Sequence, residues 1–140
     1  MIEIIDNAIQ LVVLAGCCIY SAVLSIKNKG QVWFLLTCFY GAFALGLIHW
    51  LLFMVFYSGN PKLSPVSDLS WLAGVSFLLV LQDTLRLPGE NTYRPVLALA
   101  APVFSAIMCL FFFRWGHYFL NILYALLMGA CGYNALRGLI

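Results

Sequence analysis

The chain has 140 residues, of which 64% are hydrophobic and only 9% charged, and its mean hydropathy of +1.01 excludes a soluble globular protein. Five membrane spans of about 20 residues each would leave too few residues for an attached kinase, nuclease or ATPase domain. The net charge of +2 comes from cations scattered singly along the chain. Nucleic-acid binding requires a basic stripe, so we expect no nucleic-acid partner.

Apolar runs broken by polar or turn-forming clusters predict an all-α integral membrane bundle of about five transmembrane helices. Its single domain covers residues 1–140, with spans at about 4–26, 31–57, 66–87, 95–113 and 117–136. The first span begins with Glu3 and Asp6, whereas a signal peptide begins with cations, so we expect it to be retained. It ends at the turn formed by Lys27, Asn28, Lys29 and Gly30. An alternative has four spans, with the first segment lying on the membrane surface.

The third span begins in a segment rich in serine and proline. Either Ser64 or Ser67 is a candidate N-cap, Pro65 suits a first helical position, and Asp68 would lie at the positive end of the helix dipole. Polar residues at 88–91 and at 114–117 divide the remaining sequence into the last two spans.

The distribution of cations predicts the orientation in the membrane. Lys27, Lys29, Arg86, Arg94 and Arg137 would lie on one side, against Lys62 and Arg114 on the other. Because cytoplasmic loops are enriched in Lys and Arg, we expect a multi-pass protein of the cell membrane with its N-terminus outside and its C-terminus in the cytoplasm.

His49 is the ionisable residue expected deepest in a span. It shares a helical stripe with Ala42 and Gly46, so its imidazole should face the bundle. One interpretation is a neutral histidine that is hydrogen-bonded to a neighbouring helix. The other is a role in binding a ligand, proton or cofactor.

Further polar and aromatic residues are expected on the same outer side as His49, and together they predict a ligand site. Asp68 and the imidazoles of His49 and His117 would make polar contacts, Arg114 would clamp an anion, and Trp71 would form a wall. The alternative is structural, with Asp68 at a helix start, Arg114 and His117 contacting headgroups, and the tryptophan anchoring the helix.

The sequence leaves any cofactor unidentified, and it indicates no metal site. Haem ligation by His49 and His117 is disfavoured, because the attachment motif Cys-x-x-Cys-His is missing and His117 is expected near the surface. The five cysteines fall within predicted spans without the spacing of a zinc site. Small residues four apart at Ala42 and Gly46, and at Ala125 and Gly129, predict close helix packing. They fit contacts within the bundle, in a homodimer or with a partner membrane or signalling protein, in addition to membrane lipids.

Residues 32–81 contain three recognisable stretches. They are Trp33-Phe34-Leu35-Leu36, then Phe43-Ala44-Leu45-Gly46-Leu47-Ile48-His49-Trp50, then Ser64-Pro65-Val66-Ser67-Asp68-Leu69-Ser70-Trp71-Leu72. This order resembles the multi-span N-terminal sensor modules of bacterial diguanylate cyclases and histidine kinases. Asp68 matches the acid of one family motif, while Leu47 stands where the family commonly has another. The resemblance implies membrane-embedded sensing, with the signal passing to a separate protein.

The sequence therefore favours a non-catalytic membrane protein, a sensory or small-ligand-binding module that acts through a partner. Two alternatives belong to other classes. One is an oligomeric channel or transporter subunit, against which the scarcity of ionisable groups within the spans argues. The other is a membrane-embedded enzyme acting on a lipid or quinone, which would need a nucleophile or metal beside a base.

Overall fold

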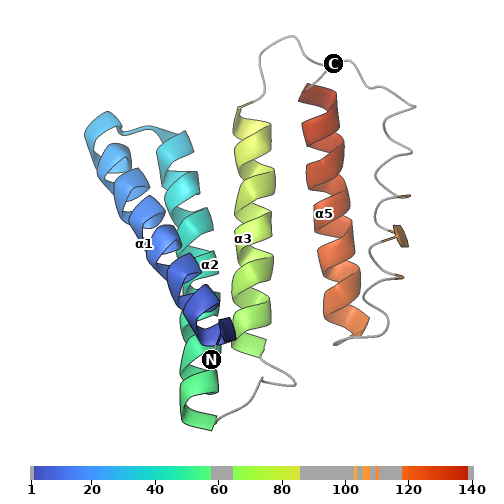
Figure 1. Ribbon diagram of the computed structural model, residues 1–140. Helices are drawn as coiled ribbons and strands as arrows, with labels where there is room; N and C mark the ends of the chain where they lie inside the picture. Colours follow the sequence, from blue (N-terminus) through green and yellow to red (C-terminus); the bar gives the residue numbers. More distant parts are fainter. Residues whose placement is uncertain are drawn as a thin grey trace. The chain divides into compact units, whose positions relative to one another are not determined.

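The computed structural model describes residues 2–57, 65–85 and 118–138, together with Val103, Ala106, Ile107 and Leu110. The described chain forms four long helices, α1 (Ile2–Asn28), α2 (Gln31–Tyr57), α3 (Pro65–Thr84) and α5 (Tyr118–Gly138) (Figure 1). The prediction of an all-α chain is confirmed, and all four helices are long and apolar enough to cross a membrane. The expected span at 95–113 lies almost entirely outside the described residues, so the count of five stays a prediction.

The turn between α1 and α2 lies where the sequence predicts it. Lys29 adopts the left-handed conformation, with a φ of 48°, and Gly30 follows it directly. The amide of Phe34 donates to the carbonyl of Gly30 over 3.3 Å, which closes the first turn of α2. A left-handed residue after the last helical position is a common helix ending, although glycine or asparagine usually occupies it.

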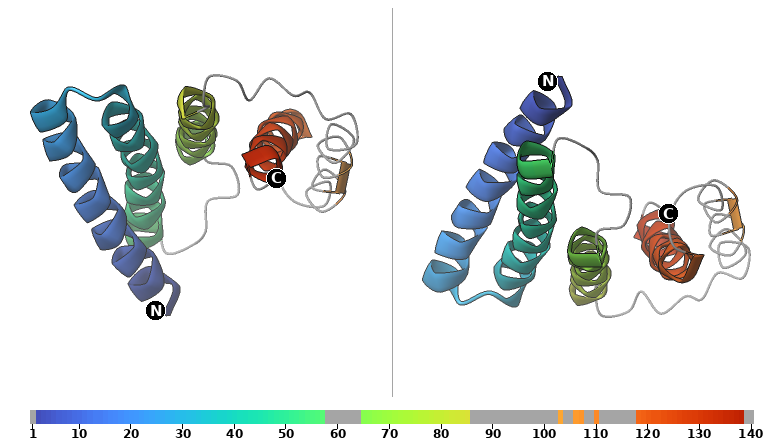
Figure 2. Two further views of the ribbon diagram at one scale, coloured as in Figure 1. Left: turned by 90° about the horizontal axis from the view of Figure 1, so that it is seen from above. Right: turned by 90° about the horizontal axis from the view of Figure 1, so that it is seen from below.

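By its contacts the chain divides into two units, Met1–Phe77 and Leu78–Ile140, and the division falls within α3. In the first unit, α1 and α2 form an antiparallel hairpin, and the beginning of α3 runs antiparallel to α2 (Figures 1 and 2). The hydroxyls of Ser21 in α1 and Thr37 in α2 lie 3.1 Å apart. Each is also close to a carbonyl of its own helix, so this polar contact between helices leaves neither hydroxyl unsatisfied.

The contact between α2 and α3 joins glycines to aromatic rings in both directions. A Cβ added to Gly46 of α2 would lie 2.5 Å from Nε1 of Trp71 in α3. A Cβ added to Gly74 of α3 would collide with the ring of Phe43 in α2. Each helix therefore lacks a side chain at the point where the other presents a ring, and the two backbones approach closely.

In the second unit, α5 has small buried residues, of which Ala125 and Gly129 are four apart and share one face. Ala125 is 1% exposed, and both Gly129 and Cys131 are buried. The side-chain nitrogen of Gln82, at the end of α3, donates to the carbonyl of Cys131 over 3.3 Å. Within the part of the chain that the structure describes, the side-chain oxygen of Gln82 is buried without a hydrogen-bond partner.

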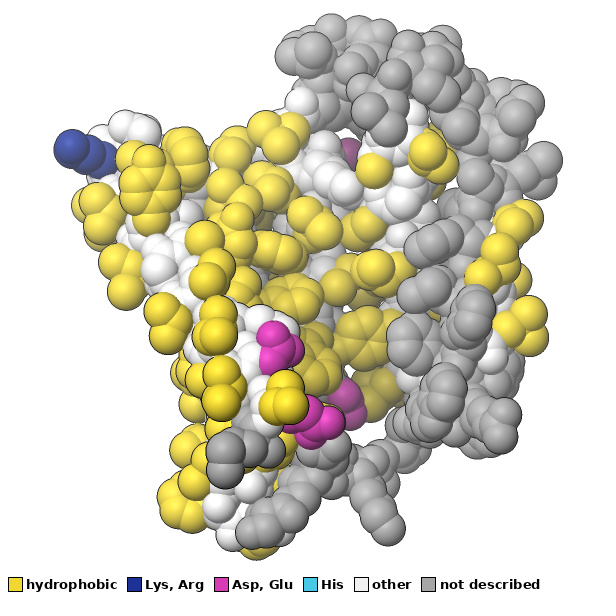
Figure 3. All heavy atoms as spheres, viewed as in Figure 1, with side chains coloured by type: hydrophobic (Ala, Val, Ile, Leu, Met, Phe, Trp, Pro, Cys, Tyr) yellow, Lys and Arg dark blue, Asp and Glu magenta, His cyan; other side chains and the backbone are white. Residues whose placement is uncertain are grey.

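The described surface is mainly apolar (Figure 3). On α1 alone, the side chains of Ile2, Ile5, Ile9, Val12, Val13, Ile19, Val23 and Ile26 are more than half exposed. Acidic side chains lie toward the first turn of α1, and lysines lie at the turn between α1 and α2. Because α1 and α2 have 27 residues each, they extend over about 40 Å. Each helix is therefore long enough to cross a hydrocarbon layer of about 30 Å. Contact with lipid would cover the exposed apolar side chains.

Candidate ligand pocket

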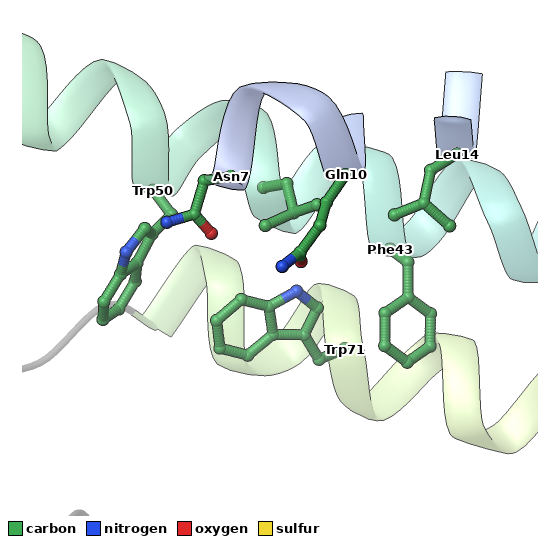
Figure 4. Close-up of a pocket in the computed structure, with 7 residues that line it drawn as sticks. Asn7, Gln10, Leu14, Phe43, Trp50 and Trp71 are labelled. Atoms are coloured by element: carbon green, nitrogen blue, oxygen red, sulfur yellow. The ribbon is translucent and has the colours of Figure 1, made fainter. Parts of the chain in front are cut away.

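A pocket of about 390 Å³ lies in the first unit, between α1, α2 and the beginning of α3. Its lining residues come from all three helices and are Asn7, Gln10, Leu14, Phe43, Leu47, Trp50 and Trp71 (Figure 4). The volume falls within the range of small-molecule sites, which are mainly apolar with a few placed polar groups. Among the described residues that line it there is no Asp, Glu, Lys, Arg or His, so these side chains offer hydrogen-bonding groups without a formal charge.

The two amides that line the pocket are oriented by neighbours on α1. The side-chain nitrogen of Gln10 donates to the carboxylate of Asp6 over 2.9 Å, and that of Asn7 donates to the carbonyl of Glu3 over 2.8 Å. A carbonyl and an ionised carboxylate only accept, so the nitrogen of each amide must face its partner. Both amide oxygens are thereby held on the opposite side, and no hydrogen bond to either is found within the described ranges.

Two indoles form the aromatic wall of the pocket. The rings of Trp50 and Trp71 lie with their centroids 5.8 Å apart and their planes inclined by 42°. This tilted arrangement is one that aromatic pairs favour. The nitrogen edge of Trp71 faces the side chain of Gln10 across the pocket (Figure 4). Gly46 leaves the space beneath this ring, so the glycine in α2 determines where the indole of α3 lies.

A hydrogen-bonded link beside the pocket joins α2 to α3. Nδ1 of His49 lies 3.1 Å from Oγ of Ser67, and that hydroxyl donates to the carbonyl of Gly46 over 3.2 Å. The hydroxyl of Ser67 therefore bridges the imidazole of His49 and the carbonyl of Gly46. Ser67 is 0% exposed, and a serine hydroxyl buried in this way requires partners.

This link corrects one sequence-based assignment. Ser67 was one of two candidates for the N-cap, yet α3 begins at Pro65 and Ser67 lies inside its first turn. Its hydroxyl reaches across to α2 instead of capping its own helix. The other candidate, Ser64, lies outside the described residues. Pro65 occupies the beginning of the helix, where a missing N–H is tolerated.

The structure brings some of the predicted site residues together. Ser67 and Trp71 lie one turn apart on α3, so His49 is joined to the helix that carries Trp71, although His49 itself does not line the pocket. Asp68 lies in the first turn of α3, half-buried and also outside the lining. The assignments of Arg114 and His117, including the haem ligation by His49 and His117, fall outside the described residues. Ligand roles for these residues stay predictions.

Sequence reasoning missed Asn7 and Gln10, although a signal was present. The two amides and Leu14 are spaced three and four residues apart on α1, which places them on one helical face. Polar side chains in an apolar span usually face the protein interior. Residues 3 and 6, one turn earlier, supply the groups that orient the amides. Neutral amides carry no charge, so the scarcity of ionisable groups in the spans gives no indication of them.

Comparison with known protein families, with curated proteins and with solved structures finds no match to this chain. Among the residues that the structure describes, no three His, Cys, Asp or Glu side chains are grouped to hold a metal ion.

Proposed function

We propose that this chain is a membrane-embedded, non-catalytic module that binds a small molecule and passes the signal to a partner protein. The observation that carries the proposal is the pocket between α1, α2 and α3, with oriented amides on one side and two indoles on the other. The resemblance of residues 32–81 to bacterial sensor modules supports the same class of function.

The pocket is suited to signalling because one of its walls, the indole of Trp71, is also part of the close contact between α2 and α3. Trp71 is held over Gly46, and the link from His49 through Ser67 lies one turn away. A ligand that pushes on the indole would therefore act on the contact between α2 and α3. A small-molecule signal requires that the ligand bind one helix arrangement more tightly than the other.

A pocket-filling substitution tests ligand binding. We expect small molecules that co-purify with the chain in lipid nanodiscs to be detected by native mass spectrometry and to be lost in Leu14→Trp. The larger side chain would occupy the cavity that Leu14 lines. The matched control is Leu126→Trp, which adds the same bulk to an exposed position on α5. Identical small-molecule content in the wild type and in Leu14→Trp would contradict the proposal.

The partner is tested in the native membrane by chemical cross-linking. We expect a cross-linked species heavier than the chain whose yield changes in Leu14→Trp and not in Leu126→Trp. An unchanged yield in Leu14→Trp would contradict the action through a partner, even if the ligand is lost in that variant.

A further inference from the structure

We propose that the pocket selects an uncharged, planar, ring-bearing molecule that has both an N–H or O–H donor and a carbonyl acceptor. This inference rests on the proposed function and adds the chemical class of the ligand. It also differs from the site predicted from sequence, in which Asp68 and Arg114 would contact a charged or amphipathic molecule.

The lining residues that the structure describes carry no formal charge, and this disfavours an anion in particular. The lining side chains within the described ranges are two amides, two indoles, a phenyl ring and two leucines. An anion placed beside such groups loses part of its hydration and gains no counter-charge from them, and this is unfavourable. The carboxylate of Asp6, which accepts a hydrogen bond from the amide of Gln10, keeps its negative charge and further disfavours an anion. A neutral ligand avoids this penalty.

The donor and acceptor atoms define the polar part of the ligand. The carbonyl oxygens of Asn7 and Gln10 are turned away from their helix partners and are available to accept from an N–H or O–H group. The indole N–H of Trp71 can only donate, and within the described ranges it makes no hydrogen bond. It therefore suits a carbonyl oxygen. A primary or secondary amide contains both complementary groups.

The walls define the apolar part. Trp50 and Trp71 present indole surfaces, and Phe43 and Leu14 line the space beside them (Figure 4). Leu47 also belongs to the lining. Aromatic walls favour a flat ring, which stacks or contacts edge to face with little loss of conformational entropy. A volume of about 390 Å³ accommodates one or two fused rings with a polar substituent better than a lipid with two acyl chains.

The inference is tested with two probes of almost the same shape, 2-naphthamide and 2-naphthoate. The first is neutral, and the second is an anion at neutral pH. Their dissociation constants are measured by equilibrium dialysis of the full chain in nonionic detergent. The other chamber holds the same detergent micelles without protein, so that the probe dissolved in micelles is equal on both sides. We expect 2-naphthamide to bind and 2-naphthoate to bind at least about thirtyfold more weakly, because the anion finds no counter-charge.

Variants identify the atoms responsible. Gln10→Leu removes an acceptor, and Trp71→Phe removes the N–H while keeping a ring. Each should weaken 2-naphthamide binding roughly three- to tenfold, the effect of one neutral hydrogen bond. The matched control is Gln82→Leu, which removes an amide from the second unit and should leave the affinity unchanged. Two independent pocket variants keep the test decisive if one of them fails to fold.

The outcomes separate this inference from the proposed function. Equal affinity for both probes, binding of neither, or affinity that is the same in Gln10→Leu and Trp71→Phe as in the wild type would overturn the chemical class. If 2-naphthoate binds better and Leu14→Trp abolishes its binding, the chemical class is wrong while the ligand-binding function stands. If Leu14→Trp affects neither the probes nor the co-purified molecules, both proposals fail.

Discussion

Gly46 and Trp71 illustrate how one missing Cβ positions the candidate site. The ring nitrogen of Trp71 lies where a side chain on residue 46 would begin, so any larger residue must displace the indole or separate α2 from α3. The same indole forms a wall of the pocket, and the link between His49 and Ser67 lies one turn away. Packing, hydrogen bonding and the shape of the site are therefore coupled at these few residues.

We expect Gly46→Ala to lower the stability of the chain by about 1–3 kcal/mol, because overpacking forces the tryptophan or the helices to move. Gly16→Ala is the matched control, since a Cβ at Gly16 in α1 meets nothing within 4 Å. Alanine at that helical position should raise stability by up to about 1 kcal/mol. The measurement is denaturant unfolding in mixed micelles. Equal effects of the two substitutions would refute the close contact, and Trp71→Leu should relieve most of the Gly46→Ala penalty.

At the scale of the elements, the hairpin of α1 and α2 depends on one residue in an unfavourable conformation. Lys29 has a positive φ. Glycine adopts this conformation freely, but among L-residues only asparagine and aspartate adopt it at all often. Gly30 follows, and in the structure the ring of Trp33 lies 3.2 Å from the position of a Cβ on Gly30. The turn thus combines a left-handed residue with a tightly covered glycine, and it determines how α2 returns along α1.

The conformation of Lys29 predicts a difference between two substitutions. Lys29→Val should lower stability by about 1–2 kcal/mol, since a β-branched residue is strongly disfavoured at positive φ. Lys29→Asn should preserve or raise stability, because asparagine tolerates this conformation. Both remove the lysine charge, so each controls for the other. Thermal unfolding followed by circular dichroism measures the difference, and equal melting temperatures would contradict the assigned turn.

At the scale of the whole molecule, the four described helices fit an integral membrane protein, and the exposed apolar residues of α1 fit contact with lipid. The orientation follows from the sequence alone. Cations are concentrated in the loops predicted to face the cytoplasm, so we propose an outer N-terminus and five spans.

Single-cysteine labelling tests this topology. With the five native cysteines replaced, a membrane-impermeant maleimide added to intact cells should label Glu3→Cys and Asn60→Cys, and should label Asn28→Cys only after permeabilisation. These positions leave every predicted loop lysine in place, and so preserve the cations that determine orientation. Labelling of Asn28→Cys and Asn60→Cys from the same side would show that α2 does not cross the membrane. Labelling of Glu3→Cys and Asn28→Cys from the same side would favour the alternative in which the first segment lies on the surface.

The sequence predicts most of the architecture because the membrane imposes simple requirements on a chain. A helix needs about 20 apolar residues to cross it, and polar residues with glycine or proline mark the connections. The expected boundaries at residues 26 and 31 fall close to the observed end of α1 and beginning of α2. The stripe of Ala42, Gly46 and His49 likewise follows from helical periodicity, which relates residues within one helix.

The lining of the pocket could not be predicted from the sequence in this way. Asn7 in α1, Trp50 in α2 and Trp71 in α3 lie far apart along the chain, and their meeting depends on how three helices pack. Periodicity specifies which face of a helix a residue occupies, but it does not specify the partner helix or the vertical register of the contact. Ser67 shows the consequence, since its position near a helix start suggests a cap while the packed structure directs its hydroxyl to Gly46. Composition and periodicity alone determined that this is a helical membrane chain, because hydrocarbon acts on each span separately. Only tertiary packing decided which neutral groups surround the pocket, because that depends on contacts between spans.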